Sequence, residues 1–151
     1  MAIAGAALAA GLAAVGSAIG LALPGEAAAG LISEEPEKFG KALLLQVLPG
    51  TQGIYGFLAA MLILQKIGLL GGEVAEVSAS VGWQLLFASL PIAIVGLVSG
   101  MFQGKVSAAG ISTLARRPEE AGKAVILSAM VETYAVIALL VTLLVVTGVT
   151  L

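Results

Sequence analysis

Four long stretches of this chain are apolar and almost free of charge, and they restrict the possible folds more than any other feature. They cover residues 2–25, 42–65, 77–104 and 124–151, and the only charged residue inside them is Glu132. Each stretch has at least 24 residues, whereas about 20 residues of helix cross the hydrocarbon core of a bilayer. None shows the alternating polarity of a transmembrane strand, which needs roughly ten residues. The sequence therefore predicts an all-α membrane protein with four transmembrane helices.

Composition supports this class and excludes several functions. The chain is 60% hydrophobic and 11% charged, against about 25% charged residues in an ordinary soluble domain. It has no cysteine and no histidine, which rules out disulfides, thiol chemistry, Cys/His metal sites and histidine-dependent catalytic triads. The formal net charge of −2 gives no basic surface for nucleic acid. We expect no catalytic site in this chain and no nucleic-acid partner.

The basic residues predict the orientation. Six of the seven lie in the connections 26–41 and 105–123, and the connection between the second and third helices has only Lys66. Cytoplasmic loops of membrane proteins carry the excess of Lys and Arg. The first apolar stretch lacks basic residues near Met1 and is longer than the 7–15 residues typical of a signal peptide. We therefore expect a multi-pass protein of the cell membrane with both connections in the cytoplasm and both termini outside.

The chain contains two copies of one helical hairpin. The segment GKALLLQVLPGTQ, residues 40–52, aligns with GKAVILSAMVETY, residues 122–134, at an offset of 82. Internal repeats are common in membrane transport proteins, and two helices per copy make the copies parallel. We expect the first hairpin over residues 1–70 and the second over residues 77–151.

Small residues crowd the first and third helices: Gly5, Ala9, Gly16, Gly20, Gly96, Gly100 and Gly104. Glycines of the two helices match at an offset of 80, and we expect the connecting loop to absorb the difference of two residues. Small residues at four-residue spacing let helix backbones approach closely in lipid. Two interpretations are open, namely packing within the chain and a tightly curved inner wall in a ring of protomers.

The carboxylate of Glu132 needs a special explanation. Its counterpart in the first copy is Gly50, so only one copy carries an acid. A charged acid at the centre of a bilayer costs on the order of 3 kcal/mol or more. No Lys or Arg lies inside the other three apolar stretches. The remaining choices are a bound proton, a metal ion or an arginine from another subunit, beside a purely structural, hydrogen-bonded glutamate.

Polar residues of other helices lie at the same depth as Glu132. On the second helix one face carries Leu48, Thr51, Gln52 and Tyr55, since their spacing is i, i+3, i+4 and i+7. The third helix supplies Gln103. Thr51, Gln52, Gln103 and Glu132 are all 14 to 16 residues from the loop prolines Pro36 or Pro118, a spread of about 3 Å along a helix.

This set of side chains favours a cation over a proton. A hard cation needs several oxygen ligands, whereas a proton needs only the carboxyl group. Pro49 removes a backbone N–H from the second helix. In a regular α-helix this N–H would bond the carbonyl four residues earlier, which is that of Leu45. The proline alone therefore does not select Leu48 as a ligand.

Three segments, together with the duplicated hairpins, identify a family. PEKFGKALLLQVLPGTQGIYGF, FQGKVSAAGI and MVETYA resemble the membrane rotor subunit of V-type and A-type ATPases, the proteolipid K or c. The resemblance is greatest to the sodium-pumping bacterial branch. It implies a homo-oligomeric rotor ring that carries Na⁺ across the membrane at Glu132 while ATP hydrolysis elsewhere in the complex turns the ring.

The resemblance also implies individual roles and partners. The implied Na⁺ ligands are the Leu48 carbonyl and the side chains of Thr51, Gln52, Gln103 and Glu132. Tyr55 would hydrogen-bond the carboxylate and hold the site closed. The implied partners are identical copies in a ring, a stator subunit with an arginine, a central-stalk subunit at the cytoplasmic loops, and membrane lipids.

Three other functions remain as alternatives. A proton-coupled ring of the same family would use Glu132 without the other oxygens. A small four-helix multidrug/proton antiporter also uses a lone intramembrane glutamate, but it needs aromatic surface for lipophilic cations, and this chain is only 5% aromatic. A structural proteolipid without transport predicts that Glu132→Gln has no effect.

Overall fold

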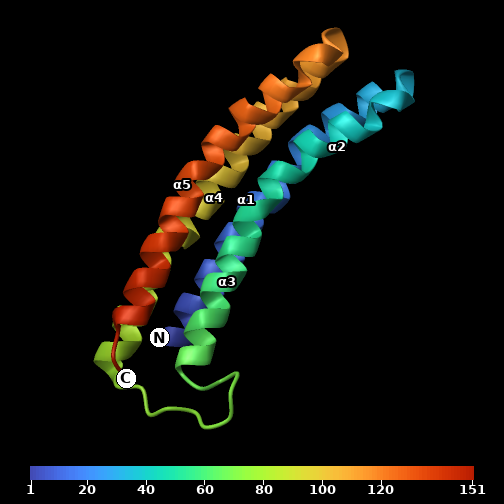
Figure 1. Ribbon diagram of the computed structural model, residues 1–151. Helices are drawn as coiled ribbons and strands as arrows, with labels where there is room; N and C mark the ends of the chain where they lie inside the picture. The colour runs from blue at the N-terminus through green and yellow to red at the C-terminus, as the bar shows by residue number, and fades with distance from the viewer.

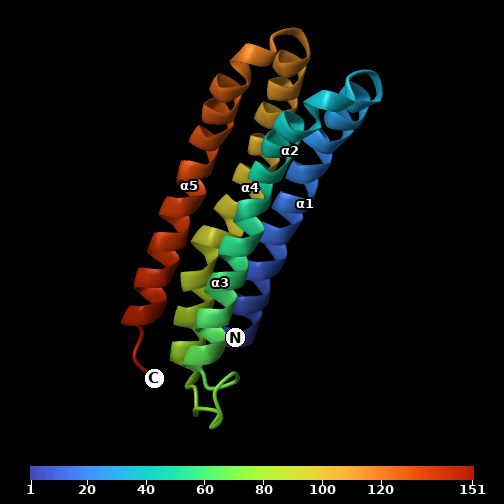
Figure 2. The ribbon, with the colours of Figure 1, turned by 45° about the vertical axis from the view of Figure 1, so that its right-hand side comes forward.

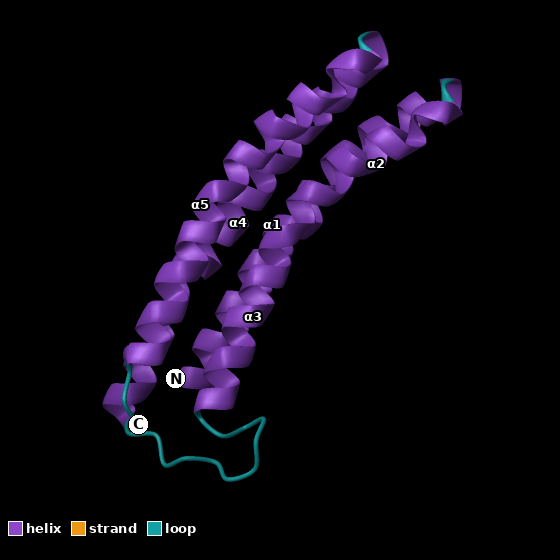
Figure 3. Cartoon of the chain, in the orientation of Figure 1, coloured by secondary structure: helices purple, strands orange, loops and turns teal.

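The computed structural model describes residues 1–151 and consists of helices joined by short connections, without strands (Figure 3). The helices are α1 (Ala2–Glu34), α2 (Phe39–Val47), α3 (Thr51–Lys66), α4 (Ala79–Arg116) and α5 (Ala121–Gly148), with 3₁₀ turns at η1 (Pro36–Lys38), η2 (Leu48–Gly50) and η3 (Pro118–Glu120). Four helical segments are long and apolar enough to span a membrane, with α2, η2 and α3 forming one of them. The predicted four-helix membrane fold is confirmed.

The four spans form two pairs that lie side by side (Figures 1 and 2). We call α1, α2 and α3 the first hairpin and α4 with α5 the second hairpin. Both termini and the connection between the hairpins lie at one end of the bundle, and the two proline turns lie at the other end. This arrangement places the basic connections together, as the charge pattern predicts.

Most residues of the segments 26–41 and 105–123 are helical. The prediction that these segments are loops is therefore wrong. Helix α1 continues to Glu34 and α4 continues to Arg116. Charged residues do not end a helix, since beyond the membrane core water solvates their side chains while the backbone keeps its hydrogen bonds.

The prolines end these helices. A proline disfavours the helical conformation in the residue before it. Accordingly Glu35, before Pro36, has φ −132° and ψ 73°, and Arg117, before Pro118, has φ −141° and ψ 79°.

The structure also corrects the register of the repeat. The ends of α1 and α4, and the turns η1 and η3, are all 82 residues apart. The offset of 80 between the glycines is wrong as a repeat register, because α1 is one unbroken helix from Ala2 to Glu34. No loop exists between Gly20 and the proline turn that could absorb two residues.

The glycines of α1 and α4 contact one another and do not occupy equivalent positions. A Cβ built on Gly16 would lie 2.5 Å from Cα of Leu97, and one on Gly104 would lie 2.6 Å from Cα of Gly20. The two backbones therefore touch directly, as small residues allow in lipid. Of the two interpretations of these glycines, packing within the chain is the one that the structure shows.

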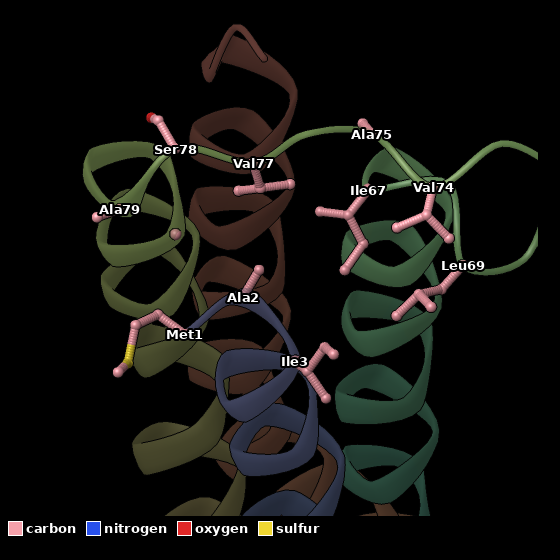
Figure 4. A pocket seen from close by; sticks show the side chains of 11 residues that line it. Met1, Ala2, Ile3, Ile67, Leu69, Val74, Ala75, Val77, Ser78 and Ala79 are labelled. Atoms are coloured by element: carbon pink, nitrogen blue, oxygen red, sulfur yellow. The ribbon is translucent and has the colours of Figure 1, made fainter.

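At the end with the termini, a glycine-capped turn closes α3. Gly68 has φ +80°, and its N–H bonds the Gln65 carbonyl while the N–H of Leu69 bonds the Leu64 carbonyl, each at 3.0 Å. This pattern is a Schellman motif, in which glycine adopts the left-handed conformation at little cost. The following segment covers an apolar hollow of about 270 Å³ at the start of α1 (Figure 4). No acidic side chain lines this hollow, so it is separate from the candidate site.

At the end with the proline turns, lysines of the first hairpin hold the second. Lys38 Nζ lies 3.0 Å from the Ala115 carbonyl oxygen, and Lys41 Nζ lies 3.2 Å from that of Pro118. Cations interact favourably with the free carbonyls at the end of a helix. These contacts fix the first hairpin against the end of α4.

Candidate functional site

The carboxylate of Glu132 on α5 is held from two other helices. Tyr55 of α3 donates its hydroxyl proton to Oε1 at 2.5 Å, and Gln103 of α4 donates from Nε2 to Oε2 at 3.4 Å. Glu132 and Tyr55 are half-buried, whereas the Gln103 side chain is fully buried. The acid is therefore anchored on its inner side and reachable on its outer side.

The hydrogen-bonded chain continues from Gln103 to the second span. Gln52 donates from Nε2 to Oε1 of Gln103 at 2.5 Å. The Thr51 hydroxyl lies 3.3 Å from Oε1 of Gln52 and 3.1 Å from the Leu48 carbonyl oxygen, and either oxygen can accept its proton. All six residues that the sequence singled out thus lie in one connected cluster, which links three helices.

The turn η2 positions the backbone part of this cluster. Pro49 has no N–H to continue the α-helical pattern, and the N–H of Thr51 bonds the Leu48 carbonyl in a tighter 3₁₀ turn. The carbonyl that faces the Thr51 hydroxyl is therefore that of Leu48. The simple proline rule, which pointed to Leu45, does not identify it.

Sequence reasoning missed one supporting residue, Ser17 of α1. The N–H of Gly53 donates to Oγ of Ser17 at 2.8 Å, just after η2. Ser17 is buried, and it holds the start of α3 against α1. The only sequence signal was a single serine in the stretch 2–25, which is otherwise built from apolar residues and glycine.

The chemistry of the cluster suits a monovalent cation. It offers one carboxylate with carbonyl, hydroxyl and amide oxygens, which are the ligand types of hard cations. The chain has no group of three or more Asp, Glu, His or Cys side chains that could hold a metal ion. A single negative charge is balanced by a single positive charge, so a divalent ion would leave an excess charge inside the membrane.

The equivalent positions of the repeat lack most of these side chains. In the register of 82, the counterparts of the six residues are Met130, Thr133, Tyr134, Ile137, Leu21 and Gly50. Thr133 contacts the Met130 carbonyl at 2.8 Å, as Thr51 contacts that of Leu48. However, a Cβ on Gly50 would meet only Leu21, at 3.5 Å. The repeat therefore keeps the threonine and the carbonyl that it contacts, but it has no counterpart of the two glutamines, the tyrosine or the carboxylate.

Comparison with known proteins gives a consistent assignment. The model of the ATP synthase C-subunit family matches the chain twice, over residues 4–63 and 86–145, again 82 residues apart. The K subunit of the V-type sodium ATPase of Enterococcus hirae is 52% identical over 132 residues, which cover 87% of this chain and 81% of that protein. The K subunit of the A-type ATP synthase of Methanocaldococcus jannaschii is 39% identical over 145 residues, covering 96% of this chain and 61% of that protein.

Proposed function

This chain belongs to the ATP synthase C-subunit family, and from that premise we propose that its copies form the rotor ring of a V-type ATPase that carries Na⁺ at Glu132. The chain itself is a membrane subunit of such a complex and not its catalytic part. Its two structural units would be the hairpins at residues 1–70 and 77–151.

The observation that carries this proposal is the cluster of oxygens around Glu132. A proton needs only the carboxylate, and a hydrogen bond from Tyr55 would complete its site. Gln103 contacts the carboxylate directly, but the fully buried amide of Gln52 and the Thr51 hydroxyl do not, and they have no role in holding a proton. They supply oxygens at the level of the carboxylate, and the E. hirae relative is named as part of a sodium ATPase.

Sodium binding solves the energetic problem of the buried acid. An ionised glutamate facing lipid costs on the order of 3 kcal/mol or more. When Na⁺ lies between the Glu132 carboxylate, the Leu48 carbonyl and the side chains of Thr51, Gln52 and Gln103, the site is neutral. The hydrogen bond from Tyr55 then keeps the carboxylate turned inward while the ring moves past lipid.

Exchange would occur where the ring meets a stator subunit. An arginine of that subunit would neutralise Glu132 while the ion leaves, and Tyr55 would release the carboxylate for that step. Water-filled half-channels would connect the exchange point to each side of the membrane.

One site per four helices favours pumping. Each positive charge moved against the membrane potential costs about 2.3 kcal/mol per 100 mV. Fewer ions per turn leave more of the free energy of ATP hydrolysis for each ion. The chain can therefore work against a steeper gradient than a ring with one acid in every hairpin.

The proline turns would face the cytoplasm. Six of the seven basic residues lie in the half of the bundle toward this end, which the positive-inside rule assigns to the cytoplasm. The turns η1 and η3 with their exposed charges would dock the central-stalk subunit, and both termini would lie outside the cell membrane.

Carbodiimide labelling of Glu132 in the purified ring tests the choice of ion, because these reagents attack the protonated carboxyl group. We expect millimolar sodium, but not potassium, to slow the labelling at fixed pH. Gln103→Leu should weaken this protection, because it removes the amide that contacts both Gln52 and Glu132. Gln84→Leu, at an exposed position of the same helix, is the matched control.

The outcomes separate the alternatives. Labelling that depends on pH alone would show a proton-coupled ring. The side-chain amides of Gln52 and Gln103 would then only pack the helices together. If a complex with the Glu132→Gln variant still transported sodium, the proposal would be refuted. The chain would then be a structural proteolipid that does not carry the ion.

A further inference from the structure

Two serines bridge α4 and α5 outside the candidate site. The hydroxyl oxygens of Ser107 on α4 and Ser128 on α5 lie 2.7 Å apart, and either one can donate the proton. Both side chains are fully buried. Every other hydrogen bond between two side chains of this chain belongs to the cluster around Glu132. The serine pair is therefore a link between two membrane spans that the proposed function does not use.

The pair lies one helical turn from the site. Ser107 follows Gln103 by four residues, and Ser128 precedes Glu132 by four. Each serine thus shares a helix face with the site residue beside it, about 6 Å away along the axis. The bond from Gln103 to Glu132 is the only hydrogen bond of the site between α4 and α5. The serines join the same two helices at the next level toward the proline turns.

The contact beside the serines is the longest in the cluster. Nε2 of Gln103 lies 3.4 Å from Oε2 of Glu132, whereas N–H···O bonds usually measure about 2.7–3.2 Å. A slightly wider gap between α4 and α5 would break this contact. α4 cannot close such a gap by moving, because its backbone at Gly104 packs directly on Gly20 of α1. The distance of α5 from α4 therefore decides whether Gln103 reaches the carboxylate.

Helix α5 has few other polar attachments near the site. It runs along α4 at one side of the bundle (Figures 1 and 2), and in its apolar core 22% of the residues are buried within the chain, the lowest share of the four spans. Thr142, ten residues beyond Glu132, accepts the N–H of Ile92 at 3.3 Å. When Tyr55 releases the carboxylate for ion exchange, the serine pair is the nearest hydrogen bond that still holds α5 against α4.

The first hairpin has no hydroxyl pair at this level. The residues 82 positions earlier, which we call the repeat images of the serines, are Gly25 and Gln46. The side-chain nitrogen of Gln46 lies 2.8 Å from where a Cβ on Gly25 would be. One long side chain thus takes the place of two short ones. The hydroxyl pair occurs only in the hairpin that carries the acid.

We propose that the Ser107–Ser128 pair is a positioning element of the ion site, which holds α5 at the distance from α4 at which Gln103 reaches the Glu132 carboxylate. The serines form no hydrogen bond with the carboxylate and act through the two helix backbones. Because their bond keeps the helices together, only the Glu132 side chain moves while the ion is exchanged. This inference rests on the proposed role of Glu132 as the ion carrier, but not on the choice of sodium as the ion.

Carbodiimide labelling of Glu132 in isolated membranes tests this role. Ser107→Ala and Ser128→Ala should each raise the sodium concentration for half-protection by roughly 3- to 20-fold, which corresponds to the strength of hydrogen bonds between membrane helices. In sodium-free buffer at fixed pH, each variant should also be labelled faster, because the carboxylate is held inward for less of the time. The double variant should shift both quantities no further than the single variants, since all three remove the same bond.

Thr142→Val is the matched control. It removes a buried hydroxyl that also links α5 to α4 and changes the side-chain volume little. Thr142 lies about 15 Å from Glu132 along the helix, whereas Ser128 lies about 6 Å away. The control should leave the sodium midpoint and the labelling rate unchanged, although it should lower the unfolding temperature of the solubilised protein as the serine variants do.

Three outcomes would overturn the positioning role. Unchanged labelling in both single variants, in protein that still migrates as an intact ring on a native gel, would show that the serines only pack the helices together. An equal shift with Thr142→Val would show that any loosening of α5 is sufficient. A double variant whose shift equals the product of the single shifts would show two independent effects and no shared bond.

The sodium proposal is judged separately in the same membranes. Absence of sodium protection in the unmodified protein would contradict sodium as the ion. The labelling rates in sodium-free buffer would then still decide whether the serine pair positions Glu132.

Discussion

Replacing Gly20 by alanine should weaken sodium binding although this residue is no ligand. A Cβ on Gly20 would lie against the Gly100 carbonyl oxygen, closer than any real contact, and 2.8 Å from Cβ of Pro49. The backbone of α4 cannot yield locally, so α1 must move away or the turn η2 must shift. Overpacking of this kind costs about 1–3 kcal/mol, and the better helix propensity of alanine returns about 1 kcal/mol.

The proline contact connects this strain to the site. η2 carries the Leu48 carbonyl and leads into Thr51, so its displacement moves two of the proposed ligands. A loss of about 1–2 kcal/mol in binding corresponds to roughly a 5- to 30-fold weaker affinity. The assay is the sodium concentration that half-protects Glu132 from carbodiimide, measured together with the thermal unfolding of the ring in detergent.

Gly30→Ala is the control on the same helix, because a Cβ there meets nothing within 4 Å. It should leave the sodium midpoint unchanged and keep or slightly raise the unfolding temperature. If Gly20→Ala behaves like Gly30→Ala in both measurements, the close contact between α1 and η2 does not shape the site, and the reasoning is refuted.

Three further changes have defined outcomes. Tyr55→Phe removes a hydrogen bond to the Glu132 carboxylate, and such a bond to a charged group contributes about 1.5–3 kcal/mol. Sodium release, measured by rapid filtration, should therefore become at least about tenfold faster. An unchanged release rate would exclude a gating role for Tyr55. Lys38→Met should lower the free energy of unfolding by about 1–2 kcal/mol, because the Lys38 side chain is 11% exposed and bonds a helix end. The control Lys123→Met, at a side chain that is 78% exposed, should change it by less than about 0.5 kcal/mol. Equal losses in the two variants would show that the buried Lys38 contact does not stabilise the fold. Gly50→Glu should not raise the sodium bound per chain, because the two glutamines and the tyrosine also have no counterpart there. The Cβ at this position would meet only ordinary contacts. A doubled sodium content would show that a carboxylate alone makes a site.

The register of the repeat shows where sequence matching misleads. Glycines of α1 and α4 match at 80 because the two helices carry complementary small residues at the places where they touch. Contact partners and repeat images both appear as similar residues at a fixed separation. Only the packing of Gly20 on Gly100, and the unbroken α1, distinguish the two.

The predicted loop boundaries were wrong for a related reason. Charge marks where a chain leaves the apolar core of a membrane, but a helix can continue for several turns in water. Proline decides where the helix ends, through its effect on the preceding residue. The sequence contained both signals, and the structure shows that proline governs the backbone while charge governs only the depth.

By itself, the sequence determined the four spans, the duplication and the set of candidate site residues, because hydropathy, internal similarity and residue type are properties of the chain alone. Tertiary structure decided how these residues meet. Through η2 it placed the Leu48 carbonyl beside the Thr51 hydroxyl, it joined residues from three helices into one hydrogen-bonded cluster, and it brought Ser17 against the start of α3. Such contacts depend on the rotation and spacing of whole helices, which side chains distant in the sequence fix together.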